Sequence, residues 1–183
     1  MESLSGSDYI YRSAKMTDLR AIYDIQNVPF RTEVFDTSLP SFEKYSAERE
    51  YAIKSGTEHY LLLEKDRILQ GFTRFIYSNE VWLTTIWGKW LKTLCYASCI
   101  SGFDLLKFER SVFAVRESNK RMVRVCVEFG FHLAEQAPIV LFFDGPPHIQ
   151  QVMMNYYLIT PQEWNDKREE WSKKVLSLKV QLE

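Results

Sequence analysis

Apolar and polar positions alternate at the start of the chain and then change to a helical spacing. In "DYIYRSAK", Tyr9 and Tyr11 alternate with Ile10 and Arg12, which predicts a strand. The next segment, "MTDLRAIYDIQNV", begins with Thr17 as the expected N-cap. Its apolar residues share one helical face: Leu19, Ile22, Tyr23 and Ile25. We therefore expect a first strand followed by a helix.

The middle of the first half predicts a second helix and a hairpin. "SFEKYSAEREYAIKSG" begins with Ser41, a good N-cap, and ends at Gly56, a good C-terminal stop. After it, residues 59–64 and 68–77 are strand-like and are joined by a Lys-Asp turn. The segment "PFRTEVFDTSLP" between the two helices is expected to be a loop or a broken helix.

The second half repeats the alternation of strands and helices. "EVWLTTI" predicts a short strand, and "WGKWLKTLCYASCISGF" a helix that stops at Gly102. Residues 108–115 are rich in β-branched and aromatic side chains and predict a strand. The segment "SNKRMVRVCVEFGF" predicts a helix with Asn119 at its start and Gly130 as its C-cap. A hairpin then closes over "DGPP" in residues 137–159.

The chain ends with a polar segment that contains two tryptophans. Thr160 caps it and Pro161 takes the first helical position, so we expect a C-terminal helical extension over residues 161–183 after a domain of residues 1–160. This helix either packs on the domain or contacts a partner, such as the second copy in a homodimer. The order β-α-α-β-β-β-α-β-α-β-β-α indicates an α/β (α+β) fold.

Composition narrows the class of ligand. The chain has 183 residues, of which 46% are hydrophobic and 26% charged, as in an ordinary globular protein. Its formal net charge of -1 gives no overall field that would attract nucleic acid or an anionic membrane. A small ligand, an amine or a protein remain open as partners.

The cysteines and the apolar segments bear on metal sites and on location. Cys95, Cys99 and Cys126 are sparse and odd in number, which argues against disulfides and against zinc. Cys95 and Cys99 lie one helical turn apart, so they form either half of a metal site or, as we favour, part of the core. There is no signal-peptide pattern and no run of about 20 apolar residues. We expect a cytoplasmic protein.

Several short motifs occur in a fixed order along the second half. They are Trp87-Gly88-Lys89, Asn119, Phe129-Gly130-Phe131, Asp144-Gly145 and Glu163-Trp164. Together with the N-terminal strand and "MTDLRAIYDI", this order resembles the GNAT-fold N-acetyltransferases over about residues 8–164. The branch that it most resembles contains the ribosomal-protein alanine acetyltransferases of the RimJ/RimL type. The resemblance implies a central mixed, mostly antiparallel twisted sheet flanked by helices.

The resemblance also implies a reaction. Members of the superfamily use acetyl-CoA and transfer its acetyl group to a primary amine by direct attack on the thioester. A protein N-terminus, a polyamine or an amino sugar would serve as the acceptor here. The alternative is a catalytically degenerate GNAT-fold protein with a binding or structural role, as in some phage-encoded proteins.

The expected cofactor site is the strand-to-helix junction at Ile86–Leu91. A helix N-terminus presents free N–H groups to a pyrophosphate, and Lys89 and Lys92 would add positive charge, unless both are simply solvated helix residues. Asn119 is expected both to cap its helix and to contact the cofactor. The full expected set is Trp82, Leu83, Thr84, Ile86, Trp87, Gly88, Lys89, Trp90, Leu91 and Asn119.

Three residues depart from the pattern of the superfamily. Thr85 stands where Gln or Arg is usual, and Trp90 replaces a small residue in the phosphate loop. The indole of Trp90 must point away, or it covers the phosphate site. Cys126 occupies the position at which many members carry a tyrosine that protonates the leaving thiolate. It either donates this proton or is a small core residue.

The remaining candidates concern the acceptor. Glu80 is the first choice for the base that deprotonates the amine, and His59 the second, although either is also a plausible surface residue. Backbone N–H groups of residues 82–84 would polarise the thioester oxygen where two strands part. The expected acceptor-binding residues are Phe30, Phe35 and Tyr77, together with Trp82, for each of which core packing is the alternative.

Overall fold

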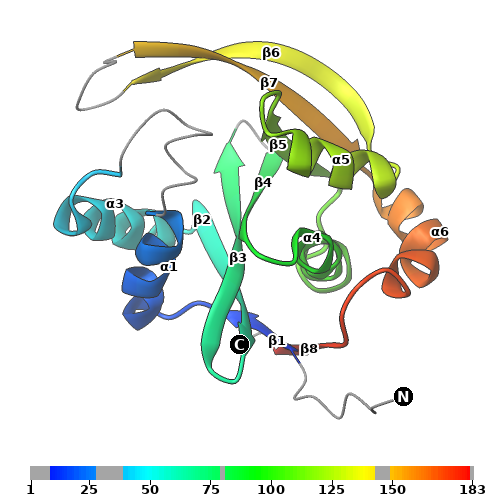
Figure 1. Cartoon of the computed structure of the whole chain (residues 1–183), viewed down its shortest axis with the longest axis horizontal. Helices are drawn as coiled ribbons and strands as arrows, with labels where there is room; N and C mark the ends of the chain where they lie inside the picture. The colour runs from blue at the N-terminus through cyan, green and yellow to red at the C-terminus, as the bar shows by residue number, and fades with distance from the viewer. Residues whose placement is uncertain (1–8, 28–38, 79–80, 143–148, 182–183) are drawn as a thin grey trace.

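The computed structural model describes residues 9–27, 39–78, 81–142 and 149–181. Within these residues the strands form one sheet in the order β6-β7-β5-β4-β3-β2-β1-β8 (Figure 1). The strands are β1 (Tyr9–Ser13), β2 (Glu58–Lys65), β3 (Ile68–Ser78), β4 (Val81–Gly88), β5 (Ser111–Arg116), β6 (His132–Phe142), β7 (Ile149–Ile159) and β8 (Leu178–Gln181). The β4–β5 and β1–β8 pairs are parallel, and the other pairs are antiparallel.

Helices cover both faces of this sheet (Figure 1). They are η1 (Met16–Asp18), α1 (Leu19–Gln26), α3 (Phe42–Lys54), α4 (Leu91–Cys99), η2 (Ile100–Leu105), α5 (Lys120–Glu128) and α6 (Pro161–Ser172). Residues of α1 and α3 share one apolar cluster with Tyr60, Leu62 and Phe72 of the sheet. Residues of α4, α5 and α6 share a larger cluster on the other face. The mixed, mostly antiparallel sheet flanked by helices confirms the expected fold class.

Three of the expected caps are confirmed because they depend on neighbouring residues alone. The Ser41 hydroxyl accepts a hydrogen bond from Lys44 N, and Asn119 Oδ1 accepts one from Met122 N. Thr160 and Glu163 form a reciprocal capping box at the start of α6.

Thr17 is not the cap of the first helix, so that expectation is wrong. It lies inside the short 3₁₀ turn η1, where Asp18 accepts a hydrogen bond from Lys15 N at 2.7 Å. Arg12 holds the same carboxylate in a salt bridge of 2.8 Å. Asp18 occupies the N-cap position of α1, but its carboxylate bonds to Lys15 N and Arg12 rather than to the helix.

Gly102 does not end the helix, so the expectation of a helix that stops there is wrong. After α4 the chain continues as the π-helix η2 through Leu105. A Cβ at Gly102 would come within 2.9 Å of the Phe108 ring. The glycine is needed there for close packing rather than for ending the helix.

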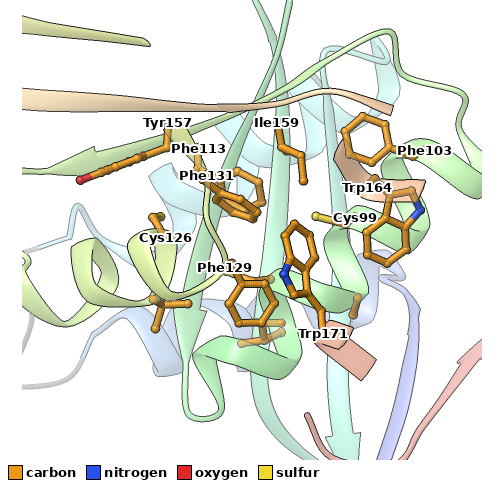
Figure 2. Close-up of a cluster of buried hydrophobic side chains, with 14 of the residues drawn as sticks. Cys99, Phe103, Phe113, Cys126, Phe129, Phe131, Tyr157, Ile159, Trp164 and Trp171 are labelled. Atoms are coloured by element: carbon orange, nitrogen blue, oxygen red, sulfur yellow. The ribbon is translucent and has the colours of Figure 1, made fainter. Parts of the chain in front are cut away.

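The C-terminal segment is helical only as far as Ser172. Its last described residues form β8, which pairs with β1 at the edge of the sheet. Trp164 and Trp171 of α6 are each 1% exposed and lie in the larger core cluster with Phe129 and Phe131 (Figure 2). The expectation of a helix through residue 183 is therefore wrong over residues 178–181. The two indoles attach α6 to the sheet core.

Candidate cofactor and catalytic site

Strands β4 and β5 run together for only a few residues and then part. Their pairing is limited to Trp82–Ser111, Leu83–Val112 and Thr84–Phe113. Strand β4 continues to Gly88, paired only with β3, and β5 continues to Arg116, paired only with β7. The backbone of residues 85–88 thus has no strand partner on the β5 side within the described residues. The gap begins one residue after the segment 82–84 that was expected to face it.

Helix α4 begins directly beside this gap. Its first backbone hydrogen bond runs from Leu94 N to the Trp90 carbonyl at 3.0 Å. The preceding N–H groups, at residues 91–93, therefore have no partner within the helix. Because the positive end of the helix dipole lies there too, this turn is suited to binding an anion.

Gly88 is explained by its contact with the neighbouring strand. Its φ is +113°, and a Cβ there would come within 2.5 Å of both Gln70 O and Gly71 Cα. The next N–H, of Lys89, donates to the Gln70 carbonyl at 2.9 Å. The glycine permits β4 to change direction while it stays in close contact with β3. The Lys89 N–H is bonded within the protein, so it is not free to bind a ligand.

The Trp90 indole is held against the first strand. The residue has the left-handed φ of 59° and its side chain is 45% exposed. Its ring meets the Tyr9 ring edge-on with 6.0 Å between centroids, and Lys65 Nζ lies 5.3 Å from the centre of the Tyr9 ring. The indole is therefore held on the β1 side of the α4 turn, whereas the gap lies on the β5 side.

The other expected cofactor residues divide between the two faces of the sheet. Thr84 is buried and shares a hydrogen bond of 2.9 Å with Ser111 across the β4–β5 pair. Ile86 and Leu91 pack against the larger cluster, and Trp87 stacks with Phe72 on the α1–α3 face. Since these side chains are buried or packed against the two clusters, we expect the backbone of β4 to face a ligand.

Cys126 is a core residue. Its side chain is 0% exposed and lies among the large side chains of the α4–α6 cluster (Figure 2). Burial raises the pKa of the thiol to about 12. The burial of the thiol in the core favours the reading of Cys126 as a small core residue over its reading as the donor of a proton to a leaving thiolate. Cys95 and Cys99 are equally buried in this cluster, which favours packing over a metal half-site.

An aromatic cluster lies on the α4 face of the sheet, at the end where β4 begins. The Trp82 ring is 5.1 Å from the Tyr77 ring, 5.2 Å from the His59 ring and stacked at 5.1 Å on Phe108. Tyr77 is 46% exposed. Partial burial lowers the pKa of His59 below its ordinary value, so the imidazole is neutral at pH 7 and can accept a proton.

Three expected residues lie outside the described residues: Phe30, Phe35 and Glu80.

A buried ionic network joins α3 to the sheet, and sequence reasoning did not predict it. Glu58 of β2, which is 6% exposed, accepts hydrogen bonds from Arg74 Nε at 3.0 Å, Arg49 at 2.8 Å and the Tyr60 hydroxyl at 2.9 Å. Burial raises the pKa of this carboxyl, but the two arginines outweigh it and lower the pKa overall. The sequence signal that could have indicated it is a carboxylate, Glu58, at the start of the apolar strand segment "TEHYLLL".

Comparisons with known proteins support the fold. Neither a protein-family model nor a curated protein sequence matches the chain. Among solved structures, spermidine N-acetyltransferase from Vibrio cholerae in complex with CoA and spermine is similar, with a TM-score of 0.71 and 17% identity over 86% of this chain and 98% of that one. A dodecameric structure of that enzyme in an intermediate state gives a TM-score of 0.67 and 18% identity over 87% of this chain and 98% of that one.

The comparisons identify the fold of the chain. The chain has the fold of the GNAT N-acetyltransferases, a sheet with flanking helices that it shares with these structural neighbours. At this level of identity the likeness concerns the fold. None of the described helices combines the length and the apolar character that crossing a membrane requires.

Proposed function

We propose that this protein is an acetyl-CoA-dependent N-acetyltransferase that acts on a primary amine. The observation that carries the proposal is the gap between β4 and β5 beside the free N–H groups of the first turn of α4. This arrangement places unpaired backbone of β4 beside a helix turn that is suited to binding an anion. The similar fold of an enzyme crystallised with CoA and spermine supports the same reading.

The first turn of α4 fits the pyrophosphate of coenzyme A. The N–H groups of Leu91, Lys92 and Thr93 would hold it, and the exposed Lys89 side chain would add charge. Trp90 leaves the turn open because its indole packs on Tyr9. Bound acetyl-CoA would supply a thioester carbonyl, the group that an amine attacks. Unpaired backbone N–H groups of β4 beyond Thr84 would stabilise the negative charge on the carbonyl oxygen.

The acceptor amine must lose a proton before it attacks, because amines are protonated near pH 7. We propose Glu80 as the base. His59 is a second base, neutral at pH 7 because burial lowers its pKa. The Trp82 ring contacts the rings of both His59 and Tyr77. We assign Tyr77 and Trp82, with Phe30 and Phe35, to the acceptor side. Asn119 would contact the cofactor in addition to capping α5.

Two acceptor classes stand out. The resemblance to the RimJ/RimL branch favours a protein N-terminus, whereas the spermine-bound neighbour favours a polyamine; an amino sugar is the third class. We also propose a cytoplasmic location, and assembly into a homodimer or a larger oligomer, since one neighbour is a dodecamer.

A second function is favoured by a specific observation. The Lys89 N–H is bonded to Gln70, and a tryptophan stands where the superfamily has a small residue. A loop with fewer free donors would hold coenzyme A weakly. On this alternative the protein keeps the fold but serves as a binding or structural component without turnover.

The two functions are separated by measuring thiol release from acetyl-CoA with a panel of amines. The panel contains spermidine, glucosamine and short peptides with free N-termini. Acetyl transfer to one class, confirmed by the mass of its product, supports the enzyme. Binding of acetyl-CoA without transfer to any amine supports the degenerate protein. Lys89→Gln should raise the KM for acetyl-CoA several-fold, whereas the matched Lys54→Gln on α3 should leave it unchanged.

A further inference from the structure

The end of the chain is attached to the first turn of α4. We call residues 173–181 the C-terminal strap; they run from the end of α6 at Ser172 into β8. Leu176 N in the strap donates a hydrogen bond of 3.3 Å to Thr93 Oγ1, in the first turn of α4. Thr93 is 2% exposed, so breaking this bond would leave a buried hydroxyl without the partner that it has here.

A second contact links the strap to the N-cap of α4 by way of β1. Leu178 of the strap pairs with Tyr9 of β1, and both side chains pack against the larger core cluster. The Tyr9 ring in turn meets the ring of Trp90, the N-cap residue, edge-on at 6.0 Å. The N-cap and the third residue of α4 are therefore both held, one by the strand that pairs with the strap and the other by the strap itself.

Trp90 has a backbone conformation that its surroundings must impose. Its φ of 59° and ψ of 44° are left-handed, a region in which a bulky residue is strained. Such strain persists only where the neighbouring structure fixes it. The contact with Tyr9 is one that holds Trp90 in place. If this support is lost, the junction between β4 and α4 has a second, relaxed arrangement available to it.

The strap itself is built to detach without unfolding of the domain. β8 has four residues and lies at the edge of the sheet, where β1 is its neighbour (Figure 1). Its residues are alternately half-buried and exposed, and none is fully buried. The preceding α6 is anchored by Trp171, which is 1% exposed. Segments with few buried contacts open at a lower free energy than the whole domain. The strap can therefore leave the sheet while α6 stays in place.

We propose that the C-terminal strap is a conformational device that controls the first turn of α4. The docked strap holds Trp90 and Thr93 so that the N–H groups of residues 91–93 point out of the helix end without partners in the helix. When the strap detaches, Thr93 loses its bond to Leu176, Tyr9 loses its strand partner and Trp90 relaxes. A ligand that binds the docked form of the turn favours docking of the strap, and docking favours the ligand. This coupling to a ligand rests on the proposed function, whereas the link between strap and turn does not.

Amide hydrogen exchange of the full chain, read residue by residue by NMR, tests the link without any ligand. Thr93→Val removes the acceptor of the Leu176 N–H and nearly preserves the volume of the side chain. Exchange of the hydrogen-bonded amides of β8 should become about tenfold faster, the effect of losing one hydrogen bond and leaving its donor unpaired. The amide of Leu94, which makes the first backbone bond of α4, should accelerate with them.

Two further variants separate the hydroxyl from general changes in α4. Thr93→Ser keeps the acceptor and should restore the slow exchange of β8. Ser98→Ala is the matched control, because Ser98 is equally buried in α4 but its hydroxyl bonds to carbonyls of its own helix, those of Leu94 and Cys95. This variant should leave the exchange of β8 as it is in the wild type.

Three results of the exchange experiment would overturn the inference. One is equal exchange of β8 in Thr93→Val and the wild type. Another is faster exchange of β8 with an unchanged Leu94 amide, since strap and turn would then move independently. The third is an equal acceleration of the core strands β2 and β3, which would mean that the variant is destabilised as a whole.

Saturating acetyl-CoA tests the coupling separately. Since the ligand binds the docked form, it should slow the exchange of β8 several-fold. Binding of acetyl-CoA, shown by calorimetry, with no change in the exchange of β8 would overturn the coupling and leave the proposed function intact. Absence of binding would count against the proposed function, and exchange in the free chain would still decide the link between strap and turn.

Discussion

Gly71 and Gly88 face each other across strands β3 and β4, and neither has room for a side chain. A Cβ on Gly88 would come within 2.5 Å of Gly71 Cα, and a Cβ on Gly71 within 2.5 Å of the Trp87 carbonyl oxygen. The two glycines bring β3 and β4 close together at the point where β4 leaves the sheet. The position of the first turn of α4 therefore depends on this contact.

Gly88→Ala should lower the free energy of unfolding by about 3 kcal/mol, since it combines a clash with backbone strain at φ +113°. The matched control is Gly56→Ala, where φ is +72° but no atom lies within 4 Å. That change should cost about 1 kcal/mol, the backbone term alone. Urea unfolding measures both. Equal losses would contradict the close contact between the strands.

Local and long-range features differ in how far the sequence predicts them. The caps at Ser41, Asn119 and Thr160 follow from residues within one helical turn, so the sequence predicts them. The role of Gly88 depends on Gly71, a residue on another strand, and the sequence alone indicates only a junction. Strand β8 likewise forms because β1 offers it an edge, which no local pattern of residues 178–181 indicates.

The candidate site shows the same division. The order of short motifs predicts where the junction of β4 and α4 lies, because a strand followed by a helix is a local pattern. The burial of Cys126 depends on what packs over α5, and the network at Glu58 depends on arginines from two other elements. Neither can be deduced from the spacing of residues along the chain.

Trp90→Gly tests whether the indole obstructs binding of acetyl-CoA at the first turn of α4. The ring packs on Tyr9, so removing it should change the dissociation constant of acetyl-CoA by less than about threefold. Glycine also relieves the left-handed φ of 59°, which partly offsets the lost packing. Calorimetry with acetyl-CoA gives the constants. An affinity gain of about tenfold or more would show that the indole covers the turn.

The burial of Cys126 predicts a loss of stability at alkaline pH. Its pKa is raised to about 12, above the value of a thiol in the unfolded chain. The unfolded state loses this proton first as the pH rises, so the stabilising effect is complete below about pH 8.5 and declines toward pH 12. In Cys126→Ala this decline should be smaller. Urea midpoints between pH 8 and 11 provide the test.

Cys126→Ala should also leave the pH profile of acetyl transfer unchanged, since the thiol is buried in the core. A loss of turnover in a variant that remains folded would return Cys126 to a catalytic role.

Glu58→Gln should lower the free energy of unfolding by about 3 kcal/mol at pH 7, because it leaves two arginines partly buried without their common carboxylate. The pKa of Glu58 is lowered in the folded state, so its contribution is complete above the ordinary value of 4.5 and disappears as the pH falls below it. The difference between the wild type and the variant should therefore shrink in acid. The exposed Glu50→Gln is the control and should change stability by less than about 1 kcal/mol.

The proposed function requires that the turn between β4 and α4 binds the pyrophosphate of coenzyme A. Titration of acetyl-CoA into the purified protein by calorimetry tests it most directly. A dissociation constant in the micromolar range, weakened several-fold by Lys89→Gln, is the predicted result. Absence of binding up to about millimolar acetyl-CoA, a free energy weaker than about -4 kcal/mol, would contradict it.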